Sequence, residues 1–282
     1  MKNLILKILK KLGYTLKGIK PTIKNNDFYS IVKFLLENKK NIHTYFDIGA
    51  NKGQSIEIFK KMNVNSQIHS FEPTLELYKG LIEKYKNDKT IKINNIGVGK
   101  EKDKLTFYSF NKASPVNSFS PMDKKSKFYK ARLYSTSSND SNFTSQTKIN
   151  VTSVDSYCNE NNIEEIDFMK IDTQGFEEEV LMGSKKMLRE QKIGIIQLEI
   201  IFGFAYEKQS SLFKIEENLY QNGYRCIAVT NSGNILSWSA FQSDFLYVKK
   251  DIYDHIKNLH EENKDIKGVT KSIKKQKGQV LY

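Results

Sequence analysis

Acidic residues and glycines at the ends of short apolar runs are the features of this sequence that could do chemistry. Residues 47–53 read Asp-Ile-Gly-Ala-Asn-Lys-Gly, follow a short β-prone run and lead into a helical pattern over residues 55–62. A strand, tight turn and helix places backbone N–H groups and the positive end of a helix dipole at the carboxyl edge of a sheet, where a nucleotide-like ligand fits. We expect Gly49 and Gly53 to let the backbone approach that ligand, because a side chain at either position would fill the space.

The spacing in this turn favours a sulfonium nucleoside over a dinucleotide. The two glycines are four residues apart, as G-x-x-x-G, whereas the dinucleotide fingerprint needs G-x-G-x-x-G. Asp47 would also repel a phosphate and attract a cation. S-adenosylmethionine, with its ammonium, sulfonium and carboxylate groups, meets these conditions. Taken alone, the turn leaves a purely structural strand-to-helix connection as the alternative.

A second candidate acid follows the next predicted strand. Residues 67–71 read as a strand that ends at Glu72-Pro73, and Thr74 can cap the helix after it. Glu72 lies about twenty residues beyond the glycine turn, where a carboxylate can accept hydrogen bonds from both ribose hydroxyls. The alternative is an acid that only stabilises the helix start. Asn95, near the end of a third strand predicted at residues 91–98, is placed to contact an adenine edge.

The third candidate region repeats the pattern of the first. A buried strand at residues 167–171 delivers Asp172 to the same edge, Gly175 turns into a helix predicted to run to Leu188, and a strand at residues 193–199 ends at Glu199. Asp172 is the first candidate for a general base or for the group that orients an acceptor hydroxyl, and Glu199 is the second. Either could instead hold a divalent cation with the acceptor or cap a helix.

Other catalytic groups are missing from the motifs. No His and Cys cluster has zinc spacing, so no metal site is predicted, and the sequence has neither a G-x-S-x-G elbow nor a P-loop. We interpret all four histidines as structural or surface residues: His43, His69, His255 and His260. Methyl transfer suits this inventory, because the sulfonium already carries a leaving group and the protein has only to align the reactants and remove a proton.

The elements that must position these residues alternate between strand and helix, which predicts an α/β fold with a mainly parallel sheet covered on both faces. Residues 105–110 are an added β-segment, and residues 111–146 read as a loop that contacts substrate or forms a lid. The predicted organisation is an N-terminal helical, basic segment at residues 1–40, which includes a helix at 28–38, a catalytic domain at 41–250 and a basic tail at 251–282.

Composition bounds the location and the partners. The two cysteines imply no disulfide framework, and the longest apolar run in residues 1–14 is too short for a signal peptide or membrane span, so we expect a cytoplasmic protein. The net charge of +13 is concentrated at the two ends of the chain. It fits an anionic membrane face, nucleic acid, an acidic substrate or merely solvated termini. An amphipathic pattern at Ile5, Ile8, Leu9 and Leu12 could rest on the inner membrane face, on the domain or on a second subunit in a homo-oligomer.

An ordered series of motifs over residues 45–249 resembles the FkbM-type methyltransferases. The matching segments are Asp47-Ile48-Gly49-Ala50-Asn51-Lys52-Gly53-Gln54, Phe71-Glu72-Pro73, Lys170-Ile171-Asp172-Thr173-Gln174-Gly175-Phe176-Glu177, Val180-Leu181-Met182-Gly183-Ser184, Gln197-Leu198-Glu199 and Gln242-Ser243-Asp244-Phe245-Leu246-Tyr247-Val248. The resemblance implies a class I, Rossmann-like, doubly wound fold, with a mostly parallel seven-stranded sheet whose last strand is antiparallel. It also implies S-adenosylmethionine as cofactor and O-methylation of sugars, polysaccharides or secondary metabolites.

The resemblance also implies a site. It places residues 47–54 around the methionine part of the cofactor and Glu72 on the ribose. Together with the strand-end argument for Asn95, the predicted cofactor-binding set is Asp47, Gly49, Ala50, Asn51, Gly53, Gln54, Glu72, Pro73 and Asn95. Many family members carry D-x-E-G where this chain has Asp172-Thr173-Gln174-Gly175. Gln174 cannot act as a base, so that role falls to another residue.

Two other functions stay open at this point. A binding protein could retain the sheet without catalysis. A nucleic-acid methyltransferase is disfavoured, because such enzymes of this fold usually carry an Asn/Asp-Pro-Pro-Tyr/Phe motif where this chain has residues 172–175, and no two prolines adjoin here. We therefore expect a small-molecule or glycan acceptor, whose identity the sequence of residues 111–146 does not specify.

Overall fold

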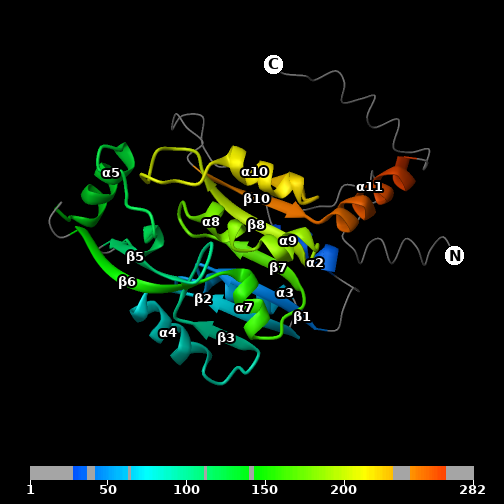
Figure 1. The fold of residues 1–282 in the computed structure, drawn as a ribbon, viewed down its shortest axis with the longest axis horizontal. Coiled ribbons are helices and arrows are strands. Elements are labelled where there is room, and N and C mark those ends of the chain that lie inside the picture. The colour runs from blue at the N-terminus through cyan, green and yellow to red at the C-terminus, as the bar shows by residue number, and fades with distance from the viewer. Residues whose placement is uncertain are drawn as a thin grey trace, which may run out of the picture.

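The structure, a computed structural model, describes residues 28–36, 42–62, 65–110, 113–139, 143–230 and 242–264. Its centre is a seven-stranded sheet with the order β3-β2-β1-β7-β8-β10-β9 (Figure 1). Five neighbouring strands are parallel, and β10 runs antiparallel to both β8 and β9. The strands are β1 His43–Ile48, β2 Ser66–Phe71, β3 Ile91–Asn94, β7 Ile166–Ile171, β8 Ile193–Ile201, β9 Arg225–Val229 and β10 Gln242–Val248. The predicted mostly parallel sheet with an antiparallel last strand is confirmed.

Helices cover both faces of this sheet, as the alternation of strands and helices predicted. One face packs against α7 Val154–Glu160, α8 Glu177–Met182, α9 Lys185–Arg189 and α10 Leu212–Gln221. The other packs against α2 Phe28–Leu36, α3 Gln54–Met62, α4 Leu75–Tyr85 and α11 Lys250–Lys264. In β1, Tyr45 belongs to the second cluster whereas Phe46 and Ile48 belong to the first, so strand side chains are buried on both sides.

A three-stranded sheet lies beside the main one, in the order β4-β6-β5. Its strands are β4 Gly97–Val98, β5 Asp103–Phe110 and β6 Thr144–Thr152, and the chain between β5 and β6 carries a short helix η1 Ser114–Val116 and α5 Lys127–Thr136. The strand predicted at residues 91–98 is therefore wrong: it is two strands, β3 and β4, in different sheets. The side-chain amide of Asn95, at the break, donates to the carbonyls of Glu72 and Pro73 instead of continuing the ladder.

The prediction of a loop at residues 111–146 is also wrong for the part that the structure describes. Val116, Met122, Tyr129 and Phe143 form a small core with Tyr206 from the segment after β8. The sequence concealed this core because Tyr129 is the one buried side chain among the ten residues of α5. A helix that buries so little has no apolar periodicity to detect.

Two helices outside the predicted catalytic domain, α2 and α11, pack against its sheet. Helix α2, assigned to the N-terminal segment, places Phe28 and Val32 in the sheet's second cluster, and Ile252 of α11, assigned to the tail, joins the same cluster. The helix predicted to reach Leu188 is broken into α8 and α9 at Gly183, where an added Cβ would lie 2.0 Å from the carbonyl oxygen of Gly99. The amphipathic pattern of residues 5–12 lies outside the described residues. No helix in the described ranges combines the length and apolar character needed to cross a membrane.

Candidate active site

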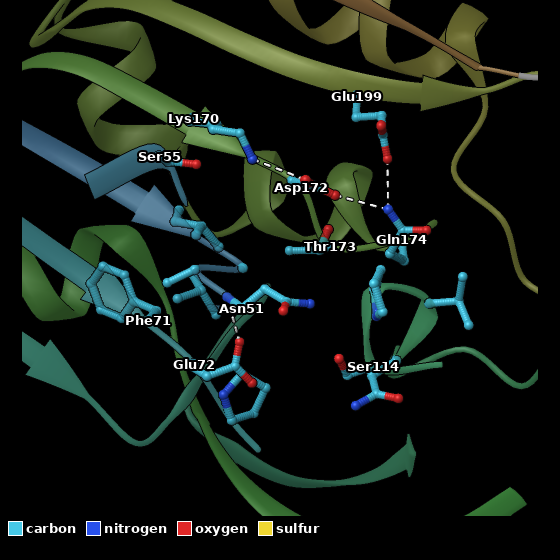
Figure 2. Close-up of a pocket in the computed structure, with 18 of the residues that line it drawn as sticks. Asn51, Ser55, Phe71, Glu72, Ser114, Lys170, Asp172, Thr173, Gln174 and Glu199 are labelled. Carbon is cyan, nitrogen blue, oxygen red and sulfur yellow. Dashed lines mark hydrogen bonds and ion pairs between the residues drawn. The ribbon is translucent and has the colours of Figure 1, made fainter. Parts of the chain in front are cut away.

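A cavity of about 410 Å³ opens at the carboxyl ends of β1, β2, β7 and β8. This is within the range typical of small-molecule sites. The strand ends form its floor, Tyr29 of α2 forms part of one side, and η1 and α5 cover it from the inserted sheet. Glu72, Asp172 and Glu199 all line it, so three of the four predicted acids face one space (Figure 2).

The glycine turn after β1 has the predicted conformation. Gly49 (φ +92°) has no room for a Cβ, which would lie 2.0 Å from the carbonyl oxygen of Asp172, and at Gly53 (φ +80°) it would lie 2.7 Å from the side chain of Leu81. Both positions are therefore confined by the protein itself. Gly49 also lines the cavity, and the expectation that these glycines let the backbone approach a ligand stays a prediction. The N–H groups of Gly49 and Ala50 both donate to the carbonyl of Phe71. The prediction that the N–H groups of this turn are free to bind a ligand is therefore wrong for these two residues.

Glu72 is held at the end of β2 in one orientation. Its two carboxylate oxygens accept from the backbone N–H groups of Asn51 and Thr74, each at 2.8 Å. Burial raises the pKa of Glu72, although these hydrogen bonds oppose the shift. Thr74 occupies the N-cap position of α4, but its side chain makes no capping bond. Each Glu72 oxygen still has a lone pair for a ligand hydroxyl.

Asn51 adds a second group that a ligand could satisfy. It lines the cavity in a left-handed conformation (φ +48°), and its side-chain oxygen is buried without a hydrogen-bond partner among the described residues. A buried amide oxygen without a partner is costly, so this atom is suited to accept from a bound ammonium or hydroxyl.

The other predicted cofactor contacts divide between lining and supporting positions. Ala50, Gln54 and Pro73 line the cavity. Gly53 and Asn95 are not among the lining residues; Asn95 is exposed and holds the turn between β2 and α4 through its two carbonyl contacts. Direct cofactor contact by Gly53 or Asn95 stays a prediction.

Asp47 lies beneath the cavity and does not line it. It is fully buried and is the register partner of Lys170 on β7, so the two side chains share the sheet face that α2 and α3 cover. Burial raises the pKa of Asp47 to about 6, although Lys170 lowers it. Contact between Asp47 and the cofactor stays a prediction, and the structure places this acid where it acts through its field.

Lys170 is the residue that the motif search missed. Its Nζ lies 2.9 Å from Oδ2 of Asp172 and is almost completely buried at the base of the cavity. Burial disfavours its charged form, but Asp172 and Asp47 outweigh this and raise the pKa of Lys170. The signal was present: a lysine interrupts the otherwise apolar run Phe168-Met169-Lys170-Ile171, and a buried lysine needs an acid beside it.

Asp172 and Glu199 are joined by one side-chain amide. Nε2 of Gln174 donates to Oδ1 of Asp172 at 2.8 Å and to Oε2 of Glu199 at 2.6 Å (Figure 2). Gln242 donates to the other oxygen of Glu199 at 2.7 Å. Gln174 has a left-handed backbone (φ +56°), which directs its amide between the two acids. The predicted proximity of Asp172 and Glu199 is confirmed.

The two acids of this pair have different proton affinities. Burial favours the neutral form of Asp172, but the charge of Lys170 and the hydrogen bond from Gln174 outweigh burial and lower its pKa. Burial, together with the charges of Asp172 and Asp244, raises the pKa of Glu199 to about 8. Near neutral pH one acid is therefore charged and the other protonated, a division often found where proton transfer is required.

The inserted sheet is attached to this pair directly. The Ser118 hydroxyl donates to the carbonyl of Gln174 at 2.8 Å, and the Tyr206 hydroxyl donates to the carbonyl of Val116 at 2.9 Å while lying 3.4 Å from the Gln174 side-chain oxygen. Phe128 and Arg132 of α5 reach the cavity from the same region. Sequence reasoning expected contact here but singled out none of these residues. Among the described residues, no group of three His, Cys, Asp or Glu side chains could hold a metal ion.

Comparisons with known proteins identify one family and several similar structures. The model of the methyltransferase FkbM domain matches residues 47–226, and a comparison with curated protein sequences gave no match. A putative rRNA-methylase from Clostridium thermocellum is 12% identical, with a TM-score of 0.45, and the alignment covers 81% of this chain and 97% of that one. Precorrin-6y C5,15-methyltransferase from Geobacter metallireducens is 11% identical, with a TM-score of 0.39 and coverage of 82% and 92%. Fibrillarin from Aeropyrum pernix, solved with bound S-adenosyl-L-methionine, is 10% identical, with a TM-score of 0.40 and coverage of 80% and 75%.

Proposed function

The chain belongs to the FkbM methyltransferase family, and on that basis we propose that it methylates a hydroxyl oxygen of a sugar, glycan or related small molecule. The observation that supports this proposal is one cavity with two kinds of acid on its walls. Glu72 is a carboxylate held in place by two backbone N–H groups, and it can accept hydrogen bonds from ribose hydroxyls. Asp172 and Glu199 are joined by the amide of Gln174 and can accept a proton from the acceptor hydroxyl. The cofactor, S-adenosylmethionine, supplies a methyl group on a sulfonium leaving group when it is bound.

The residues present fit that cofactor. Glu72 would accept from the ribose hydroxyls, and the unpartnered oxygen of Asn51 would accept from a donor on the same ligand. Asp47 lies below the turn and favours the positive charge of a sulfonium or ammonium. Pro73 and Ala50 supply apolar contact on the same walls.

Asp172 and Glu199 would act on the acceptor. Lys170 keeps Asp172 ionised, which makes Asp172 suited to accept a hydrogen bond from the hydroxyl and orient its oxygen. Glu199, with a pKa near 8, is the better matched base, because a base is most effective when its pKa lies near the working pH. Orientation can supply about 7–11 kcal/mol of the barrier, and a general base adds about 10²- to 10⁴-fold in rate.

Calorimetric titration with S-adenosylmethionine, followed by transfer of a labelled methyl group to a panel of sugars and glycans, tests the proposal. We expect Glu72→Gln to weaken cofactor binding about 10- to 100-fold, since bonds to a charged group contribute about 1.5–3 kcal/mol each. Asp172→Asn should retain cofactor binding and lose transfer. Glu76→Gln is the matched control, because Glu76 is exposed on α4 and does not line the cavity.

Two results would count against this function, provided that thermal melting shows the variants to be folded. A wild-type protein that binds no cofactor at millimolar concentration would exclude the enzyme. Tight binding without transfer to any hydroxyl would favour a non-catalytic binding protein on the same fold.

A further inference from the structure

Arg132 is a cation on the wall of the cavity opposite the sheet. It lies on α5 four residues after Phe128, so the two side chains share one face of the helix. The guanidinium carbon is 5.0 Å from the centroid of the Phe128 ring, and both residues line the cavity. The aromatic ring therefore supports the guanidinium at the cavity surface.

The helix that carries Arg132 is fixed in place. The Ser126 hydroxyl caps it by accepting from the N–H of Tyr129, and the ring of Tyr129 is buried with its centroid 5.4 Å from that of Phe143. The Thr136 hydroxyl donates to the carbonyl of Arg132. Arg132 is thus presented to the cavity by a capped helix with its own packed core.

The charge of Arg132 is not neutralised by the protein that surrounds it. Lys170, the other cation of the cavity wall, is paired with Asp172 at 2.9 Å. The Arg132 guanidinium makes no ion pair or hydrogen bond with any residue in the described ranges. A half-buried guanidinium without an acid partner is suited to bind an anionic group of a ligand, with two parallel N–H donors.

Arg132 lies on the side of the cavity where the acceptor is expected. Its charge acts on the hydroxyl of Tyr206, and that hydroxyl lies 3.4 Å from the Gln174 side chain that joins Asp172 to Glu199. Glu72, the expected ribose ligand, accepts from Asn51 and Thr74 and lies apart from Gln174 in the same cavity; Figure 2 shows the separation of Glu72 from Gln174.

We propose that the methyl acceptor carries a carboxylate or phosphate group and that Arg132 binds this group while the acceptor hydroxyl lies at Asp172 and Glu199. The inference rests on the proposed function and specifies its substrate class as an anionic sugar or glycan. Arg132 is the specificity residue, because a neutral acceptor would leave its guanidinium in the cavity without a counter-charge.

The test is a titration of the full-length protein with glucuronate, glucose 6-phosphate and glucose, both without cofactor and with saturating S-adenosylhomocysteine. We expect at least one of the two anionic sugars to bind about 10- to 100-fold more tightly than glucose. Arg132→Gln should abolish this preference. Lys130→Gln removes an exposed charge from the same helix without touching the cavity, so it should leave the preference unchanged.

The outcomes separate this inference from the function on which it rests. If both anions bind no better than glucose, or the preference survives Arg132→Gln, the inference is wrong even when the cofactor binds. If Arg132→Gln instead weakens S-adenosylhomocysteine binding, Arg132 contacts the cofactor and the inference is also wrong. An Arg132-dependent preference for anions in a protein that never transfers methyl groups would support the subsite and reject the enzyme. Which of the two anionic sugars binds more tightly shows whether the anionic group of the acceptor is a carboxylate or a phosphate.

Discussion

Gln174 determines how the two candidate catalytic acids behave at the residue scale. Its amide nitrogen donates to Asp172 and Glu199 at once, so two carboxyl groups can approach one another without a metal ion or a second cation between them. A glutamate at this position would have one donor hydrogen at most, and only when protonated, so it could not donate to both acids. The departure from the D-x-E-G pattern of many family members therefore replaces a titratable group with a permanently neutral donor.

The raised pKa of Glu199 should make the free energy of unfolding depend on pH. Its folded-state pKa of about 8 lies above the ordinary value of 4.5, so the folded protein binds more protons than the unfolded chain between those pH values. The free energy of unfolding therefore falls as pH rises from about 4.5 to 8. Glu199→Gln should remove this pH dependence, which we expect to amount to about 2 kcal/mol between pH 5 and 8, at about 1.4 kcal/mol per unit of pKa after allowance for relaxation.

The measurement is urea unfolding at several pH values between 5 and 9, together with the pH–rate profile. The same substitution should slow transfer and remove an inflection near pH 8 if Glu199 is the base. Glu217→Gln on the exposed side of α10 is the control and should change neither curve, since Glu217 is exposed to solvent. A uniform loss of stability across the whole pH range would show that Glu199 is a structural residue whose ionisation does not matter.

How far the sequence specified the site depends on the kind of residue. Glu72 and Asp172 were predictable because each directly follows a strand, and parallel strands bring their carboxyl ends to one edge. Glu199 was predicted as the end of a strand at 193–199, but β8 continues to Ile201, so Glu199 lies two residues before its end. Lys170 was overlooked because the search followed strand ends, whereas Lys170 is inside a strand and acts through its ion pair with Asp172. Arg132 could not be found, because α5 has no apolar repeat that would place its face against the cavity.

At the scale of elements, strands with two buried faces were the easiest to predict. Strand β7 is buried at every position and reads as a continuous apolar run apart from its acid and lysine. Strand β6 is exposed or half-buried over most of its length, and its first residues, 144–146, lay inside the predicted loop. The position of β6 is set by its antiparallel pairing with β5, in which Asp103 lies opposite Val151 and Phe110 lies opposite Thr144. Such long-range pairing is set by tertiary structure and leaves little local signal.

The turn between β1 and α3 depends on the close approach of two strand ends. An alanine Cβ at Gly49 would lie 2.0 Å from a backbone carbonyl of Asp172, in a left-handed conformation that alanine rarely adopts. We expect Gly49→Ala to separate the ends of β1 and β7, to destabilise the protein by about 3 kcal/mol or more, and to lower cofactor affinity. Thermal unfolding and calorimetric titration measure both effects.

Gly80 provides the matched control for this substitution. It is an exposed position inside α4, and no atom lies within 4 Å of an added Cβ. Gly80→Ala should therefore stabilise the protein by about 0.5–1 kcal/mol, the difference in helix propensity between the two residues. Equal effects at the two glycines would mean that contact with Asp172 does not determine the geometry of the turn.

At the scale of the whole molecule, the cavity is assembled from two parts that are distant in sequence. The main sheet supplies the acids, and the inserted sheet supplies η1 and α5 as the opposing wall. Tyr206, in the segment after β8, connects the two parts because its ring belongs to the small core of the insertion and its hydroxyl reaches Val116. The relation between the parts is a tertiary property, so the sequence predicted substrate contact by residues 111–146 but not that η1 and α5 form a wall of the cavity.

The basic residues at the beginning of the chain give the last prediction, which concerns location. No acid opposes the lysines before Asp27, which are Lys2, Lys7, Lys10, Lys11, Lys17, Lys20 and Lys24. Each lysine near an anionic lipid surface contributes about 1 kcal/mol of attraction, which salt screens. We therefore expect the full chain to float with phosphatidylserine-containing vesicles at low salt, and not with vesicles of phosphatidylcholine alone or at high salt.

Deletion of residues 1–24 isolates this contribution, because α2 begins at Phe28 and the core that it joins is left intact. The shortened protein should retain cofactor binding and lose most of its association with anionic vesicles, since residues 1–24 carry seven lysines and no acid, whereas residues 265–282 carry five lysines and one acid. Deletion of residues 265–282 is the paired control and should reduce association less. Flotation that is insensitive to loss of residues 1–24 would show that these lysines do not bring the enzyme to a membrane, and the charge would then be a property of solvated termini.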